Sequence, residues 1–189
     1  GACADGRELV AGGDLTVRAP ESIALDGRLL AHAGVGDTGV APGGSLAVEL
    51  TRSRGFNDNG DELLVLTYPD SPRTLRLVNG DSGGVPPAES GFAAVDTDLI
   101  ESSGVDSLRL EAGGVIELES GLDLALARRL ELDAPAIAVI GGGDVALKAG
   151  YLAIGQTLAT DSTAAATAGD SDLRLDAGLI DIIGSTVLQ

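Results

Sequence analysis

The sequence predicts an all-β fold, a parallel β-helix whose coils are about 21 to 22 residues long. One observation is a short motif, Leu-x-Leu-x-Ala followed by Gly or Pro, that returns through the chain. Another is a constant spacing between equivalent residues. The third is composition. With 28 glycines, two Phe, two Tyr and no Met or Trp, the chain must fill its core with small aliphatic side chains, which suit a narrow β interior better than a helical bundle.

Each copy of the motif predicts a half-buried strand. In the copy "LRLEAG", Leu108 and Leu110 fall on one face while Arg109 and Glu111 fall on the other. This alternation is the period of a β-strand, and the following Gly or Pro ends it. The copies begin at Leu15, Leu108, Leu130, Val145 and Leu173. A second strand is expected seven or eight residues after each start, at Ile23, Ile116, Ile137, Leu152 and Ile180.

The longer period predicts how the strands stack. Three series of apolar residues recur at this coil spacing: Leu108, Leu130, Leu152 and Leu173; Ile116, Ile137, Leu158 and Ile180; Leu124, Val145, Ala166 and Val187. Three strands per turn are typical of a β-helix, in which each coil buries its apolar face against the next. Two further columns follow, an inward one of Leu110, Leu132, Ile154 and Leu175, and an outward one of Arg109, Glu131, Ala153 and Arg174. The alternative is a β-sandwich, but its strands would reverse direction without this constant register.

The first half of the chain is less regular. A coil begins at Leu15, Ile23 and Leu29, and strands resume at Leu46, Leu63 and Leu75. Between these strands we expect three loops inserted at turns of the helix, at 31–44, 51–62 and 79–91, because loop length adds little entropy cost. The whole chain, 1–189, is expected to be a single β-helix segment of a larger protein, with its most regular coils in 105–189.

Charge and composition exclude several partners. The formal net charge of −17 would repel phosphate backbones and anionic lipids, so we expect no nucleic-acid partner. No apolar run approaches the length of about 20 residues that spans a bilayer, so we expect no membrane insertion. Cys3 is the only cysteine, which excludes an internal disulfide framework. The segment "GACADGRELV" lacks the features of a signal peptide, and we expect the chain to be a monomeric piece of a longer one.

The repeat style resembles the large exoproteins of two-partner secretion systems, the filamentous-haemagglutinin-like family. The stretches that carry the resemblance are "SIALDGRLLAHAG", "GGSLAVEL", "LRLEAGGVIELESG" and "LELDAPAIAVIGGGDVALKAG". The resemblance implies a right-handed β-helix in a surface protein of a Gram-negative bacterium. It also implies passage through an outer-membrane transporter and a role in adhesion or in delivery of a toxin domain.

One pentapeptide suggests a serine protease. The sequence "GDSGG", with Ser82 at its centre, matches the nucleophile motif of chymotrypsin-like proteases, and His32 is the only histidine. A triad needs a base, an orienting acid and an oxyanion hole. The interval from His32 to Ser82 is too short for two β-barrels, and Val85 stands where that family has proline. We therefore interpret "NGDSGG" as a turn and His32 as a loop or turn residue.

A second segment suggests a cation site. The sequence "NDNGDE" offers oxygen ligands that Ca²⁺ prefers, from Asn57, Asp58, Asn59, Asp61 and Glu62. It does not fit the EF-hand spacing, whose first position would be Gly55. A solvated loop is the alternative that we favour. The sequence thus predicts no bound metal, no cofactor and no catalytic residue.

Two classes of function remain open. The first is a structural or adhesive segment, a rigid stalk or binding surface whose partner is a receptor or glycan on a host or neighbouring cell. The second is a polysaccharide lyase or hydrolase, since Glu117, Asp123 and Glu131 are acids at outward positions. Four aromatic residues in the whole chain make a long sugar-binding groove a poor fit. We therefore expect the structural role and no enzymatic activity.

Overall fold

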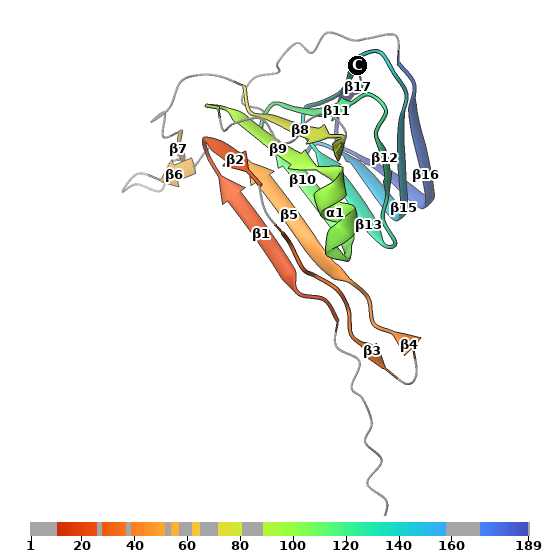
Figure 1. Cartoon of the computed structure of the whole chain (residues 1–189). Helices are drawn as coiled ribbons and strands as arrows, with labels where there is room; N and C mark the ends of the chain where they lie inside the picture. Colours follow the sequence, from red (N-terminus) through yellow and green to blue (C-terminus); the bar gives the residue numbers. More distant parts are fainter. Residues whose placement is uncertain are drawn as a thin grey trace, which may run out of the picture.

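Two parallel β-sheets make up the body of the molecule (Figure 1). The computed structural model describes residues 11–25, 28–36, 39–51, 54–56, 62–64, 72–80, 89–157 and 171–188. Sheet A has the order β1 (Asp14–Ala19), β5 (Gly44–Leu50), β10 (Val105–Ala112), β13 (Arg129–Asp133) and β15 (Val145–Gly155), with β12 (Asp123–Ala125) and β16 (Leu173–Ile183) both paired to β15. Sheet B has the order β2 (Ser22–Ala24), β9 (Phe92–Asp96), β8 (Thr74–Val78), β11 (Val115–Glu119), β14 (Ala136–Ile140) and β17 (Val187–Leu188). The prediction of an all-β fold with parallel strands is confirmed.

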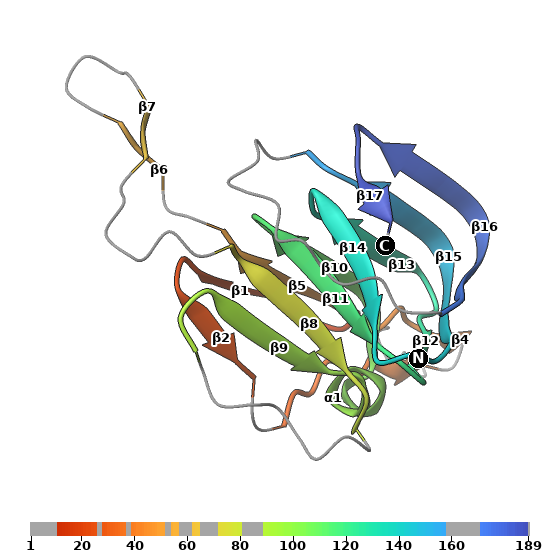
Figure 2. The same cartoon turned by 90° about the horizontal axis from the view of Figure 1, so that it is seen from above.

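The core lies between the two sheets (Figure 2). Alternate residues of each strand point into it: Leu46, Leu108, Leu110, Leu130 and Leu132 from sheet A, and Leu75, Ile116, Leu118 and Ile137 from sheet B. All of these side chains are 1% exposed or less. Each contributes about 1.5–3 kcal/mol by leaving water, so the aliphatic repeats, in place of aromatic residues, supply the stabilising burial.

The predicted register holds in the middle of the stack. In sheet A, Leu108 pairs with Leu130 and Leu130 pairs with Leu152, so each strand pairs with the strand one predicted coil further along the chain. In sheet B, Ile116 pairs with Ile137, which is again one coil later. The inward column therefore includes Leu110, Leu132 and Ile154 as expected.

The register predicted for the last coil is wrong. Leu152 pairs with Ile180, which lies more than one coil further along the chain, whereas Leu173 pairs with Val145. Accordingly Ile182 follows Ile154, where Leu175 was expected, and Asp181 follows Ala153, where Arg174 was expected. The motif spacing misled because β15 and β16 are long strands, each of which contains two apolar runs. The expected and observed registers differ by seven positions, an odd shift that would turn the opposite face inward in an uninterrupted strand. Here the inward alternation changes phase inside each long strand, between Ala149 and Leu152 in β15 and between their register partners Ala177 and Ile180 in β16.

The third predicted series is also corrected. Leu124 pairs with Leu147 in place of Val145. Val187 belongs to sheet B and pairs with Ala136. Ala166 of this series lies outside the described residues, as does Leu158 of the second series. Ile180, the last member of the second series, lies in sheet A and not in sheet B with Ile116 and Ile137.

The first half departs from a simple stack. β9 lies between β2 and β8, so the strands of sheet B do not follow chain order. Two short antiparallel pairs are present: β3 (Val35–Gly36) with β4 (Gly39–Val40), inside the expected insertion 31–44, and β6 (Arg54–Phe56) with β7 (Glu62–Leu64), which begins in the expected insertion 51–62 and extends past its end. Leu63 is therefore in a hairpin strand outside the two parallel sheets.

One helix, α1 (Thr97–Ser103), connects the two sheets between β9 and β10. The Asp96 carboxylate caps it by accepting a hydrogen bond from the Asp98 N–H, and Gly104, with φ of 79°, ends it in the left-handed conformation. The sequence analysis did not predict this helix, because so short a segment does not show a helical period. Its caps were nevertheless visible in "DTDLIESSG".

A buried arginine fixes the corner between the sheets. Arg73 is 1% exposed. Its Nε donates a hydrogen bond to the Pro20 carbonyl at 2.7 Å, and its Nη2 lies 3.3 Å from Glu21 Oε2. Gly114 packs against its backbone so closely that an added Cβ would lie 2.8 Å from the Arg73 carbonyl oxygen. The corner thus requires glycine at this position.

Candidate functional site

The fourth position of the repeat places charged side chains side by side on sheet A. Parallel pairing aligns Arg18 of β1 with Glu49 of β5, Glu49 with Glu111 of β10, and Glu111 with Asp133 of β13. Adjacent strands are about 4.8 Å apart, so three carboxylates stand in a row. They are also buried, with Glu49 8%, Glu111 6% and Asp133 7% exposed.

Arg109 connects this row to its neighbours. Its Nη2 lies 2.7 Å from Glu111 Oε2 and 3.5 Å from Asp133 Oδ2, while its Nε lies 3.8 Å from Glu131 Oε2. Glu131 also pairs with Arg129. We call Arg109, Glu111, Glu131 and Asp133 the Arg109 cluster. One guanidinium thus compensates three carboxylates from two strands, because register brings positions two and four of successive repeats together.

The carboxylates at the two ends of the row, Glu49 and Asp133, have partners outside the Arg109 cluster. Glu49 pairs with Arg18 from the neighbouring strand. Asp133 accepts hydrogen bonds from the Thr157 backbone N–H, at 2.8 Å, and from the Thr157 hydroxyl. The four acids Glu49, Glu111, Glu131 and Asp133 are therefore matched against Arg18, Arg109 and Arg129. Each carboxylate has at least one cationic or hydroxyl partner.

The pKa of the Glu111 carboxyl is raised in the folded chain. Burial raises the pKa of its carboxyl above the usual value, Arg109 opposes this by its positive charge, and the charges of Glu49 and Asp133 raise the pKa further. A carboxyl whose pKa is raised is the electrostatic pattern of a general acid.

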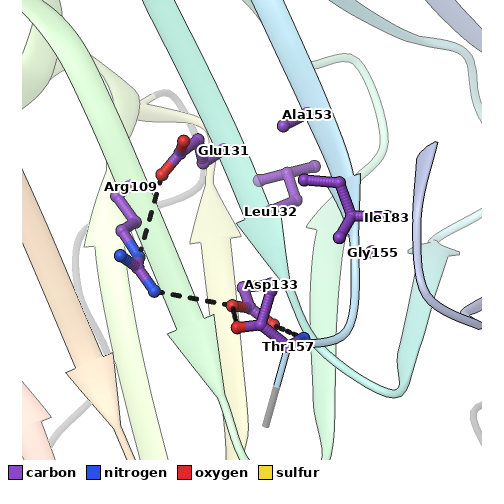
Figure 3. A pocket seen from close by; sticks show the side chains of 8 residues that line it. All are labelled: Arg109, Glu131, Leu132, Asp133, Ala153, Gly155, Thr157 and Ile183. Carbon is purple, nitrogen blue, oxygen red and sulfur yellow. Dashed lines mark hydrogen bonds and ion pairs between the residues drawn. The ribbon is translucent and has the colours of Figure 1, made fainter. Parts of the chain in front are cut away.

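A small cavity opens next to the cluster (Figure 3). Its volume is about 110 Å³, and its lining residues are Arg109, Glu131, Leu132, Asp133, Ala153, Gly155, Thr157 and Ile183. Sites for organic ligands are typically about 300–1,000 Å³, whereas a water molecule occupies about 30 Å³. The cavity therefore has room for a few waters or a small ion and is too small to enclose a sugar ring.

Polar contacts outside the cluster include one on each sheet that involves an aromatic ring. On sheet B, Arg76 holds Glu117 at 2.6 Å and stacks over the ring of Phe92, with 5.1 Å to its centroid. On sheet A, the Tyr151 hydroxyl donates a hydrogen bond to Asp181 at 2.8 Å, and this bond is the main reason that the pKa of Tyr151 is raised.

The acids suggested by the sequence for polysaccharide chemistry do not lie on one face. Glu117 is on sheet B, whereas Asp123 and Glu131 are on sheet A. Sequence reasoning instead missed Glu49, Glu111 and Asp133 as a group. The signal was present, because each acid follows the Leu-x-Leu or Leu-x-Val of its repeat directly. The sequence did not indicate that these three carboxylates are buried.

The other sequence candidates are placed as follows. Ser82 and Cys3 lie outside the described residues, as do Asn57, Asp58, Asn59 and Asp61, while Glu62 is the first residue of β7. His32 is exposed and packs beside Gly104. Within the described part of the chain, no three His, Cys, Asp or Glu side chains are grouped to hold a metal ion, and no helix is long and apolar enough to cross a membrane.

Comparison of the chain with known protein families, with curated proteins and with solved structures found no match in any of the three.

Proposed function

We propose that the chain is a right-handed parallel β-helix that serves as a rigid stalk or binding surface of a secreted or surface-displayed bacterial exoprotein. The observation that carries the proposal is the pairing of equivalent repeat residues from strand to strand, Leu108 with Leu130 and Leu130 with Leu152. Such pairing buries each apolar face on the next strand. In an elongated solenoid of this kind every coil contacts only its neighbours, and the hydrogen-bonded strands between successive coils would hold it as a rigid rod.

The turn from sheet A to sheet B supports a repeating coil. The separation between the stacked residue of sheet A and that of sheet B is eight residues from Leu15 to Ile23, eight from Leu108 to Ile116 and seven from Leu130 to Ile137. A nearly constant corner length is what a helical path around a common core requires. The insertions at 31–44, 51–62 and 79–91 are the proposed recognition elements, since binding residues concentrate on loops carried by a rigid scaffold.

The proposed coil path is tested by pairs of engineered cysteines in a Cys3→Ser background. Ala125 and Lys148 are register partners on β12 and β15 and both are exposed. Ala125→Cys with Lys148→Cys should form a disulfide rapidly, because bridged Cα atoms are usually about 4.4–6.8 Å apart. Asp123→Cys with Lys148→Cys, offset by two positions, is the control and should remain reduced. Bridging of the control but not of the aligned pair would contradict the proposed stacking.

Adhesion is tested by binding of beads coated with the chain to eukaryotic cells and to neighbouring bacterial cells. We expect saturable binding that is lost when 51–62 is replaced by a Gly/Ser linker of equal length. The intact chain and the linker variant should give the same circular dichroism, because the parallel sheets are unchanged. If the intact chain binds to none of these cell surfaces, the adhesive role is rejected and the role as a rigid stalk remains.

A polysaccharide-acting enzyme is the second candidate, and Glu111 is the observation that favours it. Its raised pKa and its place next to Asp133 on the adjacent strand fit the pair of carboxyl groups that glycoside hydrolysis uses. If the chain is a stalk or binding surface, it should release no reducing or unsaturated ends from acidic or neutral glycans. Release that disappears in Glu111→Gln would favour the enzyme.

A further inference from the structure

The side chains that pair with the carboxylate row of sheet A do not fully balance its charge. Four acids and three arginines form this set: Glu49, Glu111, Glu131, Asp133, Arg18, Arg109 and Arg129. Counted at full charge, four negative groups against three positive groups leave a net charge of −1. One proton would make the set neutral. Because three of the acids are buried, the excess charge is costly to leave uncompensated.

The steps of the row differ in whether an arginine contacts both carboxylates. Between Glu111 and Asp133, Arg109 Nη2 contacts both, at 2.7 Å and 3.5 Å. Arg18 pairs with Glu49 from the other side, because β1 and β10 lie on opposite sides of β5. Among the described residues, no arginine contacts Glu49 and Glu111 together. The step from β5 to β10 is therefore the one that lacks a shared cation.

Glu49 and Glu111 lie directly opposite each other across the junction of β5 and β10. They are register partners on adjacent parallel strands, which are about 4.8 Å apart, and both are buried. Like charges in this position destabilise a sheet, and two carboxyls at one site favour a state in which one of them is protonated. Burial is the main cause of the raised pKa of Glu111, Arg109 opposes it, and the charges of Glu49 and Asp133 add to it.

The same junction is weak in two other respects. The side chain of Arg18, which pairs with Glu49, is 69% exposed, so water screens its charge. The pairing of β5 with β10 is also irregular between Val105 and Ser107, where the register shifts. Charge repulsion between Glu49 and Glu111 therefore acts on a strand pair that is already interrupted near the start of β10.

We propose that the β5–β10 junction is controlled by a proton: it is tightest when the Glu49–Glu111 pair shares one proton, and it loosens when this proton leaves. The other charged groups of the set come from three strands: Arg18 from β1, Arg109 from β10, and Arg129, Glu131 and Asp133 from β13. The arginines favour loss of the proton and the acids oppose it. Since two coupled carboxyls titrate together, the proton belongs to the pair.

The direction of the pH effect is set by the raised pKa of Glu111. The folded chain holds the proton more tightly than the unfolded chain, so the junction is strongest in acid and weakens as pH rises from 4.5 through the raised pKa. Loosening of this pair separates β1 and β5 from the rest of sheet A, whereas sheet B should keep its pairing. The effect is independent of the proposed stalk or binding role.

Hydrogen exchange of the full chain, read by mass spectrometry, measures opening of the junction. After correction for the intrinsic exchange rate at each pH, protection of the β5 and β10 amides should fall between pH 4.5 and neutral pH. The expected fall is about tenfold, which corresponds to one pK unit of coupling, while β14 in sheet B should change little. Glu49→Gln and Glu111→Gln each keep the side-chain size and remove one carboxyl. Either substitution should abolish most of the fall, and the double variant should have no further effect.

Glu131→Gln is the matched control, because Glu131 is a neighbouring carboxyl that contacts both Arg109 and Arg129. It should retain the fall, and circular dichroism verifies the folding of each variant. Loss of the fall in Asp133→Asn but not in Glu49→Gln would place the proton at the β10–β13 junction and overturn the proposal. An equal fall in β14 would show that the whole chain responds, which also overturns it. Wild-type protection that stays constant or rises over this pH range would overturn it whether or not the variants fold.

Discussion

Replacing Leu132 by aspartate tests the inward column at its centre. Leu132 is 1% exposed and stacks between Leu110 and Ile154. Loss of a buried leucine costs about 2–5 kcal/mol. A carboxyl with an ordinary pKa of about 3.9 must also be neutralised at pH 7, which adds about 4 kcal/mol at about 1.36 kcal/mol per pKa unit. The total of about 6–9 kcal/mol is comparable to the whole stability of a small domain.

The neighbouring outward residue provides the contrast. Glu131 has an 18% exposed side chain and pairs with Arg109 and Arg129. Glu131→Ala should cost under about 1 kcal/mol, as partly exposed ion pairs do, because Arg109 retains Glu111 and Asp133. Leu179→Asp introduces the same carboxylate at a 57% exposed leucine of β16. At low salt it should change stability by less than about 1 kcal/mol.

Urea denaturation at pH 7 and at pH 4 measures all of these variants. Leu132→Asp should be unfolded or nearly so at pH 7, and Leu132→Ala should lie between it and the wild type. The difference between the two Leu132 variants should shrink at pH 4, where the aspartate is more easily protonated. Equal destabilisation by Leu132→Asp and Glu131→Ala, or a greater loss at Glu131, would refute the register and the stacking with it.

Four further predictions concern individual side chains. Because the pKa of Glu111 is raised in the folded state, the native protein binds its proton more tightly than the unfolded chain, and this stability is lost as pH rises from 4.5 through the raised pKa. The unfolding free energy of Glu111→Gln relative to wild type should therefore increase over that window in urea titrations at successive pH values. Asp181→Asn should lower the pKa of Tyr151 in an ultraviolet titration, since Asp181 accepts its hydrogen bond. Ser82 should not react with a fluorophosphonate, and stoichiometric labelling would contradict the turn interpretation. Millimolar Ca²⁺ should leave the melting temperature almost unchanged, whereas a saturable rise lost in Asp58→Ala would establish a cation site.

Local pattern was sufficient to predict the strands and the faces they bury. Alternation in "LRLEA" and "LELDA" assigns Leu108, Leu110, Leu130 and Leu132 to the core, and pairing one coil apart follows from matching those faces. These features depend only on side-chain period and on the need to cover aliphatic residues. Residues that are close together in the sequence are therefore sufficient to predict these features.

The last coil and the first half could not be predicted in the same way. Leu173 and Ile180 both fit an inward position, and only the pairing of the two long strands β15 and β16 assigns Ile180 to Leu152. The place of β9 between β2 and β8 likewise depends on the path of the connecting chain, which has no periodic signal.

For the candidate site too, some features follow from the sequence and others only from the tertiary structure. The sequence determined that Arg109, Glu111 and Glu131 point away from the core, because outward positions alternate with inward ones. Only the tertiary structure decided that Glu49, Glu111 and Asp133 are buried and that one arginine compensates three carboxylates. It also decided that burial raises the pKa of Glu111 although Arg109 opposes the rise. Burial and charge coupling arise between strands that are far apart in the chain. Such effects depend on distances across the sheet, and residue type and spacing do not contain those distances.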